Sequence, residues 1–127
     1  AITGAPSCGK TTLAKMITDR PVFYSDDYKH LNWSEASNML MLEVNAQSGP
    51  LVVEGVAVAR ALRKGMKVDA VIYMKRPKIE QKPGQVAMGK GIRTVFDEWR
   101  ATHPDVPVFA EPLEQHSPFE TEEEETA

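Results

Sequence analysis

The spacing of apolar residues changes repeatedly along the chain between a short-run pattern and a helical pattern. We expect strands from the short apolar runs, at 1–3, 21–24, 51–53, 68–74 and 106–109. Apolar residues recur every three to four positions in the stretches between, which predicts helices at 10–18, 34–47, 56–64 and about 92–103. Strands separated by single helices are typical of an α/β protein with a parallel sheet and helices on both faces.

Local signals at the ends of these elements support the assignment. Asn32 followed by Glu35 has the form of a capping box, and Gly65 is suited to end the helix over 56–64. Residues 75–90 are basic and interrupted by Pro and Gly, so we expect a loop there. Three residues before Gly4 are few for a buried strand, which leaves open a truncated start or an unusually short first strand.

Charge divides the chain into two parts. The 127 residues have a formal charge of −3, but residues 1–109 carry 15 basic and 11 acidic side chains, whereas 110–127 carry seven glutamates and no Lys or Arg. We therefore expect one domain over 1–109 and a disordered acidic tail over 110–127. The alternative is that the tail folds back on the basic domain or contacts a protein partner.

Composition argues against several functional classes. No window approaches the ~18 consecutive apolar residues of a membrane helix, and the start lacks the order of a secretory signal, so we expect a cytoplasmic protein without a membrane partner. A single cysteine, Cys8, fits a reducing compartment. His30, His103 and His116 lack metal-ligand spacing, and the scattered basic residues match no nucleic-acid-binding module.

One motif carries specific chemistry. It is the 4–12 loop, which matches G-x-x-x-x-G-K-[ST] and consists of Gly4, Ala5, Pro6, Ser7, Cys8, Gly9, Lys10, Thr11 and Thr12. Its glycines let successive backbone N–H groups face phosphate oxygens, and the following helix presents its positive end. The motif predicts binding of ATP or another nucleoside triphosphate, with Lys10 reaching the outer phosphates and the Thr11 hydroxyl ligating Mg²⁺. The alternative is a glycine turn with an incidental lysine.

Three carboxylates follow the next two apolar runs. Asp26 and Asp27 come after the run at 21–24, and Glu54 ends the run at 51–53. The carboxyl ends of parallel strands share one edge of the sheet, so we expect these groups beside the 4–12 loop. The alternatives are an Asx turn or helix cap for the aspartates and an exposed strand end for Glu54.

With these motifs, the chain resembles the P-loop kinases of small molecules, a group that includes adenylate, shikimate, uridine and nicotinamide riboside kinases. It is more closely similar to small kinase-like "AAA family ATPase" proteins of bacteria and phages. The closer similarity rests on the 4–12 loop together with segments 25–28, 33–37, 53–64 and 89–95. The resemblance implies a three-layer α/β/α P-loop NTPase fold with strand order 2-3-1-4-5.

The resemblance also implies roles for the acidic residues. Asp26 or Asp27 would orient an acceptor hydroxyl and take its proton, and we favour Asp26 because it comes first after the strand. Glu54 stands where the Walker-B acid is found, and would hold water on Mg²⁺ opposite Thr11. Lys10, Asp26 and Asp27 are thus the candidate catalytic residues, and Thr11, Asp26 and Glu54 the candidate metal ligands.

Cationic residues are expected to contact phosphates and the acceptor. Arg76 and Arg93, with the neighbouring lysines, lie where relatives carry a mobile lid, and Gly84, Gly89 and Gly91 would let that segment move. Arg60 and Arg63 share a helix face that would meet an anionic acceptor. A basic surface loop and a solvated helix face are the respective alternatives.

The sequence thus favours a kinase that transfers the γ-phosphate of Mg²⁺-ATP to a small-molecule hydroxyl or phosphate. Two other classes stay open: a module whose bound or slowly hydrolysed nucleotide regulates a protein partner, and a structural protein that retains a degenerate site.

Overall fold

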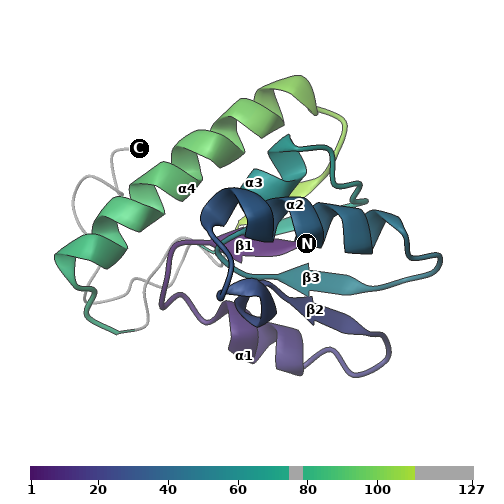
Figure 1. The fold of residues 1–127 in the computed structure, drawn as a ribbon, viewed down its shortest axis with the longest axis horizontal. Coiled ribbons are helices and arrows are strands. Elements are labelled where there is room, and N and C mark those ends of the chain that lie inside the picture. The colour runs from purple at the N-terminus through teal and green to yellow at the C-terminus, as the bar shows by residue number, and fades with distance from the viewer. Residues whose placement is uncertain (75–78, 111–127) are drawn as a thin grey trace.

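The sheet has the strand order that places the 4–12 loop near its centre. The structure, a computed structural model, describes residues 1–74 and 79–110 (Figure 1). The strands are β1 (Ile2–Gly4), β2 (Val22–Tyr24), β3 (Val52–Glu54), β4 (Val71–Met74) and β5 (Val108–Ala110). All neighbouring pairs are parallel, and the order is β2-β3-β1-β4-β5. The expected parallel sheet and its strand order are confirmed.

Helices cover both faces of this sheet. They are α1 (Lys10–Lys15), the 3-10 turn η1 (Ser25–Tyr28), α2 (Trp33–Asn45), α3 (Val58–Arg63) and α4 (Pro83–Thr102). In Figure 1, α1 lies on one side of the sheet, whereas α2, α3 and α4 lie on the other. The expected arrangement of helices on both faces is therefore confirmed.

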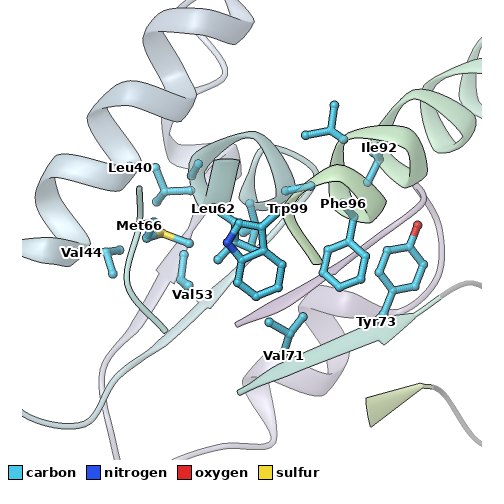
Figure 2. Packing of buried hydrophobic residues seen from close by; sticks show 14 residues of the cluster. Leu40, Val44, Val53, Leu62, Met66, Val71, Tyr73, Ile92, Phe96 and Trp99 are labelled. Atoms are coloured by element: carbon cyan, nitrogen blue, oxygen red, sulfur yellow. The ribbon is translucent and has the colours of Figure 1, made fainter. Parts of the chain in front are cut away.

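Alternation along the strands divides the buried side chains between two cores. Val53 of β3 faces α2, α3 and α4, whereas its neighbour Val52 packs in the core beneath α1. The larger core is shown in Figure 2, where side chains from α2, α3 and α4 meet those of β3 and β4. Its aromatic rings pack in series, with centroids 4.7 Å apart for Tyr73–Phe96 and 5.7 Å apart for Phe96–Trp99.

The predicted end signals act as expected at two helices. The Asn32 side chain accepts a 2.8 Å hydrogen bond from the backbone N–H of Glu35, which caps α2. Gly65 has a φ of 110° just after α3, and the N–H of Met66 returns to the carbonyl oxygen of Ala61 at 3.0 Å. Helix α1 ends at Lys15, earlier than the predicted Thr18.

The loop predicted over 75–90 is wrong for its second half. Helix α4 begins at Pro83, so Gly84, Gly89 and Gly91 are helical and do not serve as hinges of a loop. Proline suits the first helical position because its φ is preset and its missing N–H would have no helical partner. The apolar face of α4 in the larger core outweighs the ~1 kcal/mol that each interior glycine costs. Residues 75–78 lie outside the described residues.

Strand β5 extends through Ala110, the first residue of the segment predicted as a tail. Residues 111–127, where we predicted disorder, are outside the part of the chain that the structure describes. Within residues 1–74 and 79–110, none of the helices has the length and apolar character needed to cross a membrane.

Candidate functional site

The 4–12 loop joins β1 to α1 in a conformation that depends on its glycines. Gly4 has a φ of 144°, and a Cβ there would overlap the carbonyl oxygen of Met74 on the neighbouring strand. Gly9 has a φ of 85°, and Ser7 also lies in the left-handed region, at 63°. These turns bend the chain back sharply before α1 begins at Lys10. The expected strand-loop-helix context of the motif is thus present.

Lys10 is folded into the loop that precedes it. Its side chain is only 6% exposed, and its Nζ donates a 2.5 Å hydrogen bond to the carbonyl oxygen of Ala5. Burial lowers the pKa of Lys10, and the nearby charges of Cys8, Glu54 and Asp26 oppose that shift. The loop therefore surrounds a buried cation whose present partner is a neutral carbonyl.

Glu54 lies beside this lysine at the end of β3, and is 2% exposed. The Thr11 hydroxyl donates to its Oε1 at 3.1 Å, which links the first turn of α1 to β3. Burial raises the pKa of Glu54, the Thr11 hydrogen bond and Lys10 oppose the rise, and Asp26 and Asp27 add to it. The expected place of Glu54 beside the loop is thus confirmed, and the alternative of an exposed strand end is wrong, because the carboxyl group is buried.

A cavity of about 370 Å³ opens over these residues. Its walls come from the loop between Pro6 and Thr12, from Asp26, from 54–56 and from Gln85 of α4. Asp26 therefore shares the cavity with Lys10 and Glu54, whereas Asp27 does not line it. Of the two aspartates that the sequence left as alternatives, the geometry favours Asp26.

Ser25 determines where Asp26 lies. Its side chain is buried, and its hydroxyl oxygen accepts a hydrogen bond from the N–H of Ala57 at 3.5 Å. Gly55, with a φ of 134°, leaves space for Ser25, since a Cβ on Gly55 would overlap the serine hydroxyl. This contact attaches η1 to the segment after β3 and so brings Asp26 next to Glu54. Sequence reasoning missed Ser25, because a serine after a strand has no distinctive pattern.

The oxygen donors of the cavity suit a hard divalent cation. Thr11, Asp26 and Glu54 supply a hydroxyl and two carboxylates, and Mg²⁺ prefers oxygen ligands. Among the described residues, no group of three or more His, Cys, Asp or Glu side chains could hold a metal ion by itself. These donors therefore fit Mg²⁺ that arrives with phosphates, because that ion keeps several waters and seldom uses an all-protein cage.

The structure places the two predicted acceptor arginines outside the cavity walls. The guanidinium of Arg60 lies 5.6 Å from the centre of the Trp33 ring, and Arg63 pairs with Glu98 of α4 at 3.2 Å. Both arginines are thus engaged by side chains of neighbouring helices.

Of the two predicted lid arginines, the structure describes Arg93 alone and does not place it in the cavity wall. Arg93 lies within α4 and is 3.7 Å from Asp97 one turn later. Arg76 falls in the segment 75–78, outside the described residues. Among the residues that form the described cavity walls, Lys10 is the one cation.

Two glutamines that the sequence did not single out contact the 4–12 loop. Gln81 donates to the carbonyl oxygen of Pro6 at 2.5 Å, and the Gln85 amide lies 3.5 Å from the Ser7 hydroxyl. Gly89, one turn further along α4, packs against Ala5. The only available signal was the Pro83 helix start, which would have placed Gln85 in the first turn.

Comparison of the chain with protein-family models, with curated proteins and with solved structures gave no match. The functional inference therefore rests on the strand order, the 4–12 loop and the groups around its cavity.

Proposed function

We propose that this chain is a P-loop nucleoside-triphosphate-binding protein that acts as a small-molecule kinase. The observation that carries the proposal is the joint placement of Lys10, the Thr11–Glu54 pair and Asp26 around one cavity above the 4–12 loop. A parallel sheet binds its ligands beyond the carboxyl ends of its strands, and β1, β2 and β3 all end at this cavity.

The burial of the Lys10 ammonium group against a neutral carbonyl supports phosphate binding. A phosphate oxygen carries charge that the Ala5 carbonyl lacks, so it forms a stronger bond to the buried ammonium group. Backbone N–H groups at the start of α1 add donors and the positive end of the helix. Nucleotide binding would thus give the Lys10 ammonium, which has three N–H donors, a charged acceptor in addition to the neutral Ala5 carbonyl.

The acidic residues supply a cation site and a base. Thr11, Asp26 and Glu54 would hold Mg²⁺, which neutralises charge on the phosphate oxygens. Asp26 lies in the cavity and is exposed, so an acceptor hydroxyl can reach it. Its carboxylate would orient that hydroxyl and accept its proton as the new P–O bond forms.

An acceptor screen tests the proposal. The full chain is incubated with Mg²⁺ and γ-labelled ATP and with nucleosides, nucleotides or sugars, and labelled product is separated from free phosphate. We expect a labelled product with the wild-type chain, at least ~100-fold less with Lys10→Ala because that change removes a charge-assisted contact to the transferred group, and little with Asp26→Asn. Binding of ATP without any labelled acceptor would contradict the kinase assignment.

One observation favours a second candidate. Lys10 is the one cation in the described cavity walls, and Arg63 and Arg93 are paired with carboxylates, so few groups would stabilise the charge of a transferred phosphoryl group. This shortage of cations is consistent with a module that holds or slowly hydrolyses a nucleotide and thereby regulates a protein partner. Slow phosphate release that no acceptor accelerates would favour that candidate.

A further inference from the structure

The geometry points to Gln85 as a nucleotide-binding residue, a donor from α4 that hydrogen-bonds a phosphate oxygen above the 4–12 loop. This inference rests on the proposed nucleotide site and adds to it a residue that lies 75 positions beyond Lys10 in the sequence. It also gives α4 a role in ligand binding that Arg93, which pairs with Asp97, does not fill.

The orientation of the Gln85 amide is set by its own helix. The backbone N–H of Lys82 donates to Gln85 Oε1 at 2.9 Å, which satisfies a donor at the start of α4. Because an N–H can pair only with the oxygen of the carboxamide, the Nε2 end is the part that faces the 4–12 loop. Gln85 thus presents a donor, and not an acceptor, to the cavity.

The present partner of that donor is weak. Gln85 Nε2 lies 3.5 Å from the Ser7 hydroxyl oxygen, at the long limit of a hydrogen bond. A phosphate oxygen in the cavity would offer a charged acceptor, and bonds of this kind are shorter and about twice as strong as neutral ones. Nε2 can therefore exchange the Ser7 hydroxyl for a phosphate oxygen while Oε1 keeps its hydrogen bond from the N–H of Lys82.

Two further contacts keep Gln85 at this distance from the loop. Gln81 donates to the Pro6 carbonyl oxygen at 2.5 Å on one side. On the other side, Gly89 approaches Ala5 so closely that a Cβ on the glycine would lie 2.9 Å from that of Ala5. The loop is thus contacted by Gln81, which precedes α4, and by Gly89 in the second turn of α4. These contacts on both sides of Gln85 make its donor preorganised for an anionic ligand.

The test compares two variants that add one negative charge to α4. Gln85→Glu keeps an oxygen for the Lys82 N–H but replaces the donor by a carboxylate. Ala87→Glu adds the same charge at an exposed position that does not line the cavity. Titration of the full chain with Mg²⁺-ATP should give a Kd at least ~10-fold higher for Gln85→Glu, and within about twofold of wild type for Ala87→Glu.

A third variant, Gln85→Met, removes the donor without adding charge, and covers the case in which Gln85→Glu fails to fold. We expect it to raise the Kd by about three- to tenfold. Wild-type affinity in Gln85→Met, or equal losses in Gln85→Glu and Ala87→Glu, would overturn the assignment of Gln85 alone. If the wild-type chain does not bind Mg²⁺-ATP, the proposed function fails together with the assignment of Gln85. The same follows if the Lys10→Ala variant binds Mg²⁺-ATP as tightly as wild type.

Discussion

Gly89 of α4 lies directly against Ala5 of the 4–12 loop, with room for a hydrogen atom but not for a methyl group. A Cβ on Gly89 would meet the Ala5 Cβ at 2.9 Å, closer than two carbon atoms pack. A glycine in the interior of a long helix normally costs stability, so its presence here is explained by the approach of the loop and not by helix formation.

This contact predicts that alanine at position 89 and alanine at position 91 differ in their effects on stability and on binding. In Gly89→Ala the clash with Ala5 should cost about 1–3 kcal/mol, which offsets the ~1 kcal/mol gained from helix propensity. The displacement of α4 from the loop should weaken Mg²⁺-ATP binding by about three- to tenfold. Gly91→Ala is the matched control, because a Cβ there has open space, and it should stabilise the fold without changing affinity. Thermal unfolding and nucleotide titration of both variants measure the two effects, and equal affinities would contradict the prediction.

Glu54 gives a prediction on pH. Burial raises the pKa of Glu54 above its value in the unfolded chain, so the folded state holds the proton at pH values where the unfolded state has lost it. The free energy of unfolding therefore falls as pH rises from the ordinary glutamate pKa through the raised one. Glu54→Gln should remove this fall, so that the variant melts at a higher temperature than wild type at pH 7 but not at pH 4.

The same variant should bind Mg²⁺ less well. Glutamine can still accept the Thr11 hydrogen bond but carries no charge, so we expect the Mg²⁺ dependence of ATP binding to shift by about 10- to 100-fold. Titrating Mg²⁺ at constant ATP measures the shift. An unchanged Mg²⁺ requirement would exclude Glu54 from the cation site.

The contact of Ser25 with the segment after β3 predicts a positioning effect. Ser25→Ala removes the long hydrogen bond from the N–H of Ala57 and the contact of the hydroxyl with Gly55, and should cost about 1 kcal/mol. Asp26 would then be less well fixed beside Glu54, so turnover should fall more than ATP affinity. Ser48→Ala, at an exposed position, is the control. A variant that loses stability but keeps wild-type turnover would show that Ser25 is structural only.

Arg63 should contribute little to catalysis. It pairs with Glu98 at 3.2 Å, and both side chains are about half exposed, which places the expected cost of Arg63→Ala below about 1 kcal/mol. Once an acceptor is known, its KM should not change in this variant. A large rise in KM would mean that Arg63 leaves Glu98 to bind the acceptor, as the sequence alone suggested.

The sequence predicted the sheet well because its signals are local and repeated. Short apolar runs with a turn on each side define the strands, and the match of the 4–12 loop to a phosphate-binding motif depends on residues next to one another. The placement of Asp26 and Glu54 at one edge then follows from the parallel connection of strands, since their carboxyl ends must coincide.

The errors of prediction arise where distant segments meet. Gly84, Gly89 and Gly91 favour a loop by composition. The apolar face of α4 in the larger core stabilises the helix, and the close approach of Ala5 accounts for the glycine at position 89. The sequence does not single out Gln85 either, because its proposed role depends on its contact with Ser7, which lies 78 residues away in the chain. Likewise, the sequence predicts that Arg63 is free to bind an acceptor, because it does not show that Glu98 of α4 lies beside this arginine.

The division of the buried side chains between two cores has a thermodynamic consequence for the 4–12 loop. Cys8 and Ala14 belong to the small core under α1. Helix α4, which has Gln85 in its first turn, packs into the large core further along its length. A ligand that bridges the loop and α4 would join the smaller core to the larger core. Amide protons of α1 should then exchange much more slowly with bound nucleotide, and those of α2, already in the larger core, should change little.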